Sequence, residues 1–318
     1  MKKEVKEKIS IIIPCYNEEE AIPVFYKEIS KIIKEMKNIE FELLFINDGS
    51  KDNTINILKK LAKKDNKVRY ISFSRNFGKE AGMYAGLKNI TGDYGAIMDV
   101  DMQDPPAMLK QMYNILKNED YDCVALYTKD HDDYGFFRKL FTKCWYKLIN
   151  FISKTPQTPG ARDFRLMRRK MIDAIIEIGE YNRYIKGIFS YIGFETKWIE
   201  YKVPNRVAGK SKFSLIKLFK YAIEGILSFS TTPLVLSAIL GLIFCIISII
   251  AILVIIIKTL VFGDPVSGWP SLACLIIFMG GTQLFFLGII GMYLSKTYLE
   301  VKKRPLYIIK ETEKELKK

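Results

Sequence analysis

The chain has 318 residues, of which 49% are hydrophobic and 26% are charged, and its formal net charge is +14. Its single histidine, His131, excludes a histidine-based metal site and a catalytic triad, and its five scattered cysteines, with no CxxC pair, argue against zinc binding and fit a reducing compartment. The positive charge fits an anionic membrane surface or a phosphate-bearing substrate, and no nucleic-acid-binding motif accompanies it.

Strand and helix signals alternate through the first third of the chain. Apolar runs predict strands over 9–13, 41–46, 68–73 and 94–98, and helices are expected over 18–37, 52–63 and 79–87. The acidic residues at 18–20 suit the first turn of a helix, and Asp52 or Asn53 is expected to cap the next one. This alternation predicts an α/β fold with a mostly parallel sheet covered by helices on both faces.

Polar clusters follow three of the predicted strands. They are Tyr16-Asn17-Glu18, Asp48-Gly49-Ser50 and Asp99 to Asp104. Ligands bind at the carboxyl ends of the strands in sheets of this type, so the three clusters together predict one binding site.

The third cluster has the chemistry of a metal site. Asp99 and Asp101 flank one residue at the end of a strand, and the alternation of side chains directs both carboxylates to the same side. A few protein carboxylates, completed by water and substrate phosphates, are typical of Mg²⁺ or Mn²⁺. The alternative is a solvated turn before a helix, because a DxD pair alone is a weak signal. Its position at the end of a strand favours the metal site.

Two later segments combine an apolar stripe with a basic opposite face. The stripe over 134–155 fits either a core-facing helix or an interfacial helix, and the sequence leaves both open. The stripe over 215–226 leads directly into a long uncharged stretch, so we expect an in-plane helix there.

Two long stretches near the C-terminus carry no charge, one between Glu224 and Lys258 and the other between Asp264 and Lys296. Each exceeds the roughly 20 residues that a transmembrane helix needs, so two C-terminal transmembrane helices are expected. Basic residues lie before the first stretch and after the second, which predicts that both termini and the domain before the first stretch face the cytoplasm. The apolar run before Pro14 is too short for a signal peptide.

The ordered motifs resemble those of a known enzyme family. They are Ile11-Ile12-Ile13-Pro14-Cys15-Tyr16-Asn17-Glu18, then Asn47-Asp48-Gly49-Ser50 with Asp52 and Thr54, then Asp99-Val100-Asp101-Met102-Gln103-Asp104-Pro105-Pro106. Together they resemble glycosyltransferase family 2. The runs Ser74 to Ala81 and Gly187 to Phe194, the later Arg206, Gly209, Ser211 and Lys212, and the two uncharged stretches narrow the resemblance to its polyprenyl-phosphate glycosyltransferases.

The resemblance implies a GT-A, Rossmann-like domain over 1–208, an amphipathic juxtamembrane helix over 209–228, a transmembrane hairpin over 229–296 and a cytoplasmic tail over 297–318. It also implies an inverting transfer from a UDP- or GDP-sugar, with UDP-glucose first, to undecaprenyl phosphate in the cytoplasmic membrane. Some members are homotetramers, so that assembly is open here.

The resemblance also assigns residues to the donor side of the site. The residues that would hold the nucleotide-sugar are Pro14, Tyr16, Glu18, Asp48, Arg75, Lys79 and Asp99. The metal would be held by Asp99, Asp101 and Gln103. For Arg75 and Lys79 the alternative is a pair of solvated charges on a surface loop. Val100 stands where small residues are usual, and it is expected to point away from the ion.

On the acceptor side, Asp163 matches the position of the proposed catalytic base. The candidates for binding the lipid phosphate are Arg162, Arg165, Arg206, Lys210 and Lys212. For Lys210 and Lys212 the alternative is membrane-surface charge. A phosphate monoester has a second pKa of about 6, so the acceptor is already an anion and barely needs a base. Positioning and charge compensation are expected to dominate catalysis, and the role of Asp163 as a base stays open.

Two other functions fit the sequence less well. A processive polysaccharide synthase on the same fold would carry a QxxRW motif, which the sequence lacks. A non-catalytic lipid-binding subunit would not need the intact acidic and nucleotide motifs.

Overall fold

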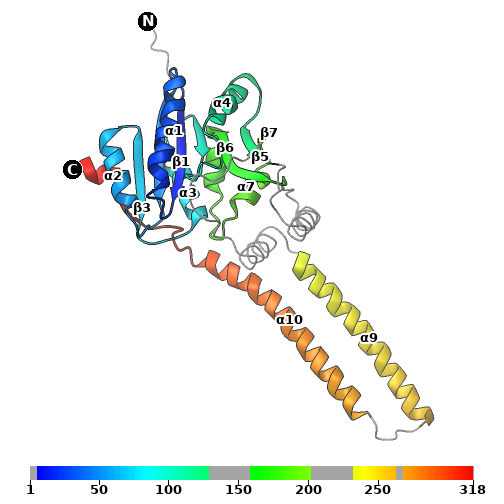
Figure 1. Cartoon of the computed structure of the whole chain (residues 1–318). Coiled ribbons are helices and arrows are strands. Elements are labelled where there is room, and N and C mark those ends of the chain that lie inside the picture. Colours follow the sequence, from blue (N-terminus) through cyan, green and yellow to red (C-terminus); the bar gives the residue numbers. More distant parts are fainter. Residues whose placement is uncertain (1–5, 129–157, 202–231, 263–267, 318) are drawn as a thin grey trace.

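The computed structural model describes residues 6–128, 158–201, 232–262 and 268–317. One sheet with flanking helices forms the body of the molecule, and two long helices extend from it (Figure 1). The two amphipathic segments expected over 134–155 and 215–226 lie outside the described residues.

The strands of the sheet are β1 (Lys8–Cys15), β2 (Glu40–Asn47), β3 (Val68–Phe73), β4 (Tyr94–Ile97), β5 (Cys123–Tyr127), β6 (Ala161–Arg168), β7 (Thr196–Glu200) and β8 (Ile309–Thr312). The helices are α1 (Ala21–Glu35), α2 (Thr54–Lys64), α3 (Lys79–Asn89), α4 (Met108–Asn118), α6 (Arg169–Glu177), α7 (Ile185–Tyr191), α9 (Thr232–Phe262) and α10 (Trp269–Val301), with a 3₁₀ turn η1 at Glu313–Lys317. The four predicted strands and three predicted helices of the first third are confirmed.

Two details of the helix ends differ from the prediction. The first helix begins at Ala21, so the acidic residues at 18–20 precede it instead of occupying its first turn. Asn53 stands at the N-cap of α2 without a side-chain capping bond, and Asp52 Oδ1 instead accepts a bond from Thr54 N at 3.1 Å.

The strand order is β7-β5-β6-β4-β1-β2-β3-β8. The central strands β4, β1, β2 and β3 are parallel neighbours, as the βα alternation predicted. Strand β6 runs antiparallel between β4 and β5, and β8 runs antiparallel along β3. The sheet is therefore mixed, with its parallel part at the centre and antiparallel strands on both sides of it.

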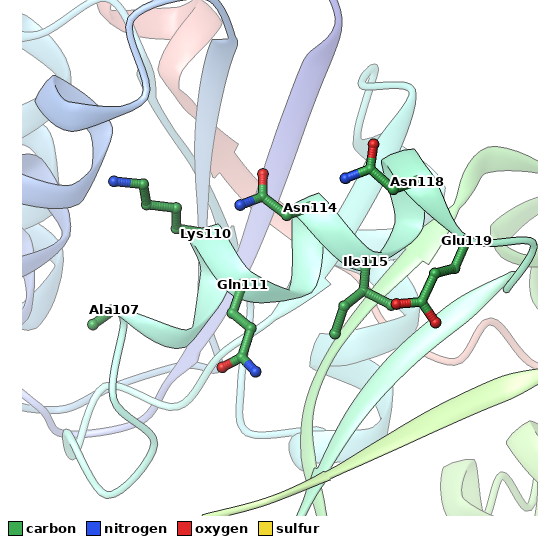
Figure 2. Close-up of a pocket in the computed structure, with 7 residues that line it drawn as sticks. All are labelled: Ala107, Lys110, Gln111, Asn114, Ile115, Asn118 and Glu119. Atoms are coloured by element: carbon green, nitrogen blue, oxygen red, sulfur yellow. The ribbon is translucent and has the colours of Figure 1, made fainter.

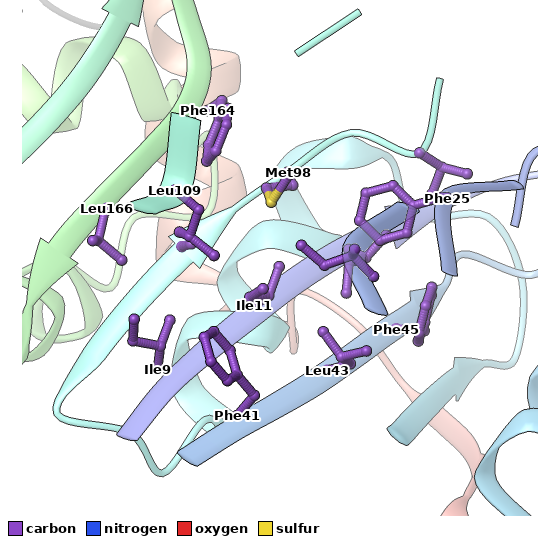
Figure 3. Close-up of a cluster of buried hydrophobic side chains, with 14 of the residues drawn as sticks. Ile9, Ile11, Phe25, Phe41, Leu43, Phe45, Met98, Leu109, Phe164 and Leu166 are labelled. Carbon is purple, nitrogen blue, oxygen red and sulfur yellow. The ribbon is translucent and has the colours of Figure 1, made fainter. Parts of the chain in front are cut away.

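Helices cover both faces of this sheet, because successive residues of the central strands face opposite sides. On one face Ile11 and Ile13 pack with buried residues of α1, α2 and α4. Figure 3 shows part of this cluster over β1 and β2. On the other face Ile12 packs with buried residues of α3, α6 and α7.

Helix α9 leads away from the sheet and α10 returns beside it (Figure 1), with Phe244 and Phe278 in edge contact at 5.7 Å. Within the described part of the chain, one stretch is long and apolar enough to cross a membrane, Phe278–Val301 in α10, and a shorter apolar stretch covers Thr232–Phe244 in α9. The sequence predicted two membrane spans, and the described residues contain one candidate span.

The chain after α10 returns to the sheet, although the sequence suggested only a tail there. Strand β8 adds to the edge of β3, and the ring of Tyr307 stacks on Phe73 at 5.0 Å. Glu313 accepts a bond from Arg69 Nε at 2.8 Å. The end of α10 is therefore anchored to the catalytic domain within a few residues.

Candidate active site

The loops that follow β1 and β2 are joined by hydrogen bonds. Asn17 N donates to Ser50 Oγ at 2.9 Å, and Asn17 Oδ1 accepts from Lys51 N at 2.8 Å. Glu18 N donates to Thr54 Oγ1 at 2.9 Å. Asn17 has a φ of 54°, in the left-handed region that asparagine tolerates better than most residues. The first two predicted clusters therefore form one surface, with Pro14 half-buried at the end of β1 and the Tyr16 side chain exposed beside it.

Asp48 organises the next loop. It is buried, and its two carboxylate oxygens accept bonds from Phe77 N at 2.6 Å and Gly78 N at 2.9 Å. Burial raises the pKa of Asp48, although these two amide bonds oppose the rise. The carboxylate thereby fixes the loop that carries Arg75 and leads to Lys79. The structure thus gives Asp48 a positioning role, and its direct contact with a nucleoside stays a prediction.

The turn at Gly49 needs a residue without a side chain. Its φ is 64°, and a Cβ atom there would collide with the backbone carbonyl of Arg75. The Arg75 side chain extends outward, with its guanidinium carbon 4.0 Å from the centre of the Phe77 ring. Glycine therefore allows the loops after β2 and β3 to stack directly.

The acidic cluster follows β4 as predicted. Asp99 and Asp101 are half-buried, whereas Val100 between them is buried in the core, so its side chain points away from the site as expected. Asp101 Oδ1 accepts a bond from Gln103 N at 3.2 Å, across Met102, which has a φ of 60°. This left-handed residue closes the turn tightly around Asp101.

Arg162 ties the antiparallel strand β6 to this acidic turn. Its Nε donates to Asp104 Oδ1 at 2.9 Å, and its Nη2 donates to Gln103 Oε1 at 3.3 Å. The Tyr201 hydroxyl also donates to Asp104. Burial raises the pKa of Asp104 against the effect of Arg162, and among the described residues its Oδ2 atom has no hydrogen-bond partner. Arg162, predicted as a lipid-phosphate residue, is thus engaged with the metal-side turn.

Lys79 connects the two sides of the site. Its Nζ lies 2.8 Å from Asp99 Oδ2 and 2.6 Å from Asp163 Oδ2, which comes from β6. Burial lowers the pKa of Lys79, but the two carboxylates outweigh it and raise the pKa above its ordinary value. Lys79 is exposed but ion-paired, because it bridges a predicted metal ligand and the predicted base, and its contact with the donor phosphates stays a prediction.

The pKa of Asp163 argues against a strong base. Burial alone would raise it, but the ammonium groups of Lys79 and Lys186 outweigh burial and hold the pKa of Asp163 well below its usual range. A carboxylate in this environment accepts a proton poorly. The arrangement favours Asp163 as the anion that positions Lys79.

Arg165 lies beneath the site. It is buried, with its guanidinium carbon 3.4 Å from the centre of the Phe189 ring, and Nη2 donates to Arg162 O at 3.2 Å. Burial lowers the pKa of Arg165. This geometry gives it a packing role, and its predicted contact with a lipid phosphate stays untested. Arg206, Lys210 and Lys212 lie outside the described residues.

Two residues of the site were missed by sequence reasoning. Glu80 follows Lys79 on α3, and its Oε2 atom accepts a bond from Ile185 N at 3.0 Å, at the start of α7. Burial, reinforced by Asp163, raises the pKa of Glu80 to about 7. The second residue is Lys186, which follows Ile185 on α7. Burial lowers the pKa of Lys186, although the negative charge of Asp163 opposes this change. Glu80 lies inside the run Ser74 to Ala81, and Lys186 directly precedes the run that begins at Gly187, but neither residue was given a role from the sequence.

The predicted metal ligands have the chemistry that a divalent cation needs. Asp99, Asp101 and Gln103 supply oxygen donors, which Mg²⁺ and Mn²⁺ prefer. Within the described ranges, no group of three His, Cys, Asp or Glu residues could hold a metal on its own. Asp104 lies close to Asp99, and among the described residues its buried Oδ2 atom has no hydrogen-bond partner. The residues present therefore fit a cation whose remaining ligands come from a diphosphate and water.

A hollow of about 430 Å³ lies along the outer side of α4 (Figure 2), between Ala107 and Glu119. It includes none of the predicted site residues and belongs to the surface of that helix.

Comparisons with known proteins identify the family of the chain. The sequence profile described as Glycosyl transferase family 2 matches residues 10–176. The SfII prophage-derived bactoprenol glucosyl transferase of Shigella flexneri is 44% identical over 305 residues, 96% of this chain and 98% of that protein. The prophage bactoprenol glucosyl transferase homolog of Escherichia coli (strain K12) is 42% identical over 96% of this chain and 100% of that protein.

Among solved structures, mannosyl-3-phosphoglycerate synthase from Rubrobacter xylanophilus superposes with a TM-score of 0.50 at 16% identity, covering 71% of this chain and 73% of that one. This likeness concerns the fold, and it supports the GT-A, Rossmann-like sheet. A glycosyltransferase is thus the class that fold and site define. The chain belongs to glycosyl transferase family 2, and the resemblance of its motifs to the polyprenyl-phosphate branch of that family is confirmed.

Proposed function

We propose that this enzyme transfers a sugar, glucose from UDP-glucose in the first instance, to undecaprenyl phosphate at the cytoplasmic face of the membrane. The observation that carries the proposal is the near full-length identity of 42–44% to relatives named bactoprenol glucosyl transferase. The match extends beyond the catalytic domain, so it includes the region of α9 and α10.

The reaction is a single displacement with inversion. An oxygen of the acceptor phosphate forms a bond to the anomeric carbon while the bond from that carbon to the donor diphosphate breaks, and the electron pair leaves with the nucleoside diphosphate. A divalent cation held by Asp99, Asp101 and Gln103 would offset the charge of this leaving group. Because the nucleophile is an anion already, no proton must be removed from it.

The residues of the chain supply position and charge. Asp48 holds the loop from which Arg75 and Lys79 can reach the donor phosphates. Pro14, Tyr16 and Glu18 lie on the adjoining surface, where the nucleoside would rest. Preorganised cations of this kind stabilise developing negative charge without reorganising during the reaction.

The membrane arrangement is part of the proposal. Helix α10 would span the bilayer through Phe278–Val301, and α9 would form a second span beside it. Both termini and the catalytic domain would lie in the cytoplasm, as the distribution of basic residues predicts. The candidate span ends at Val301, and β8 anchors the following chain to the sheet, which would keep the site close to the membrane surface. A homotetramer stays a prediction.

The test compares Asp101→Asn with Asp120→Asn, an exposed position after α4, in purified full-length protein. Transfer to undecaprenyl phosphate should fall by at least about 100-fold in the first variant and stay unchanged in the second. A chelator should abolish transfer by the wild type. Transfer that persists at full rate in chelator would contradict the metal-dependent reaction.

A further inference from the structure

Two hydrogen bonds, one from Lys186 and one from its neighbour Ile185, fix the position of Lys186. Its Nζ donates to Ala161 O of β6 at 3.2 Å. The preceding residue, Ile185, donates its N–H to Glu80 Oε2 at 3.0 Å, and Glu80 is the neighbour of Lys79 on α3. Strand β6 and helix α3 therefore fix the ammonium of Lys186 close to Asp163 and Lys79, which are its main electrostatic neighbours.

The other cations around Asp163 are already engaged. Lys79 binds both Asp99 and Asp163, and Arg162 binds Asp104. Arg165 is buried against the Phe189 ring. Within the described ranges, by contrast, no carboxylate lies within 4.0 Å of Lys186, and its hydrogen bond goes to a neutral carbonyl.

Asp163 is hydrogen-bonded to Lys79, so it acts on Lys186 only through space. Burial and the positive charges of Lys79, Arg165 and Arg162 oppose the charge on Lys186. A half-buried ammonium that makes no ion pair of its own is unfavourable. An anionic ligand would balance it through a charge-assisted hydrogen bond.

We propose that Lys186 binds the phosphate group of the lipid acceptor and thereby selects a phosphate monoester as the nucleophile. This inference rests on the proposed function. A phosphate could also come from the donor diphosphate, but the predicted donor-side residues lie at the ends of β1, β2, β3 and β4. Lys186 lies on α7 and is bonded to β6, the strand that carries Asp163, so the acceptor phosphate is the source we assign.

The experiment measures steady-state transfer by full-length Lys186→Met, Lys186→Arg and the control Lys60→Met, an exposed lysine of α2 on the other face of the sheet. Loss of one charged hydrogen bond predicts that Lys186→Met raises the KM for undecaprenyl phosphate by about tenfold or more. The KM for the nucleotide-sugar should stay within about twofold. Lys186→Arg should recover most of the loss, because it keeps the cation, and Lys60→Met should match the wild type.

Two readouts separate this role from a structural one. Calorimetric binding of UDP with Mn²⁺ should be unchanged in Lys186→Met, which also shows that the variant is folded. A raised donor KM, or an unchanged acceptor KM, would overturn the assignment of Lys186 while leaving the proposed function in place. A wild type that transfers no sugar to undecaprenyl phosphate would overturn the proposed function and this inference together.

Discussion

Asp99 and Asp163 lie on opposite sides of one ammonium group, since Lys79 Nζ is 2.8 Å from the first and 2.6 Å from the second. The donor and acceptor sides of the site are thus joined through a single side chain. A cation that binds Asp99 must compete with this ion pair.

The first prediction concerns this competition. Lys79→Met should bind Mn²⁺ several-fold more tightly than the wild type in the absence of nucleotide, because the competing positive charge is gone. Electron paramagnetic resonance of free Mn²⁺ measures this affinity directly. Sugar transfer should nevertheless fall, since Lys79 is also expected to contact the donor phosphates. Lys79→Arg keeps the charge and serves as the control; equal or weaker Mn²⁺ binding by the Met variant would contradict the prediction.

The second prediction concerns Glu80, whose pKa is raised to about 7. Below its ordinary pKa of 4.5, Glu80 is protonated in both the folded and unfolded states and does not affect stability. Between about 4.5 and 7 the unfolded chain loses the proton and the folded chain keeps it, so the wild type loses stability as the pH rises. Gln cannot titrate and can still accept the bond from Ile185 N.

Glu80→Gln should therefore raise the Tm relative to the wild type, with a gain that is absent near pH 4, grows up to about pH 7 and is constant above it. Thermal unfolding across this range measures the gain. Glu28→Gln, on α1, should show no such growth, and a gain that shrinks with rising pH would contradict the account.

The third prediction concerns the anchoring of the C-terminal strand. Arg69 is bonded to the buried Glu42 and, through Nε at 2.8 Å, to Glu313 beyond β8. Arg69→Met should lower the free energy of unfolding by about 3–5 kcal/mol, because it leaves a buried carboxylate without its partner. Lys31→Met, which breaks the exposed Lys31–Glu28 pair, should change it by less than about 1 kcal/mol. Equal effects of the two variants would show that the buried network does not stabilise the fold.

The fourth prediction concerns Gly49. Gly49→Ala introduces a left-handed alanine and a clash with the Arg75 backbone, so it should destabilise the protein by about 1–3 kcal/mol and weaken nucleotide-sugar binding. Gly179→Ala is the matched control, because a Cβ atom there meets nothing within 4 Å. Chemical denaturation and UDP titration measure both effects. If Gly49→Ala kept the stability and the UDP affinity of the wild type, the close contact between the two loops would not be needed for either property.

The central sheet could be predicted from the sequence because its strands are continuous apolar runs between helices of clear periodicity. Strand β6 was not predicted, because its sequence contains four charged residues and lacks a continuous apolar run. These residues are Arg162, Asp163, Arg165 and Arg168. Arg162 and Asp163 form ion pairs in the site with Asp104 and Lys79, whereas Arg168, at the other end of the strand, donates to backbone carbonyls. The partners of Lys79 and Arg162 depend on this antiparallel strand, so no local pattern could reveal them.

The motifs predicted the position of the acidic turn, but they did not predict the roles of Glu80 and Lys186. The pattern around Asp99 and Asp101 predicted a metal site at the end of a strand, and the structure shows that these two residues follow β4 directly, while metal binding stays a prediction. Glu80 and Lys186 are separated by more than 100 residues in the chain, and only the packing of α7 against α3 brings their neighbourhoods together.

The most direct test incubates the purified full-length protein with UDP-glucose, undecaprenyl phosphate and Mg²⁺ or Mn²⁺, and detects the lipid product by mass spectrometry. The account predicts a product heavier than undecaprenyl phosphate by one glucosyl unit, formed with release of UDP and absent in chelator and in Asp101→Asn. Wild-type protein that binds the nucleotide-sugar but forms no sugar-linked lipid with any of a panel of nucleotide-sugars would contradict it.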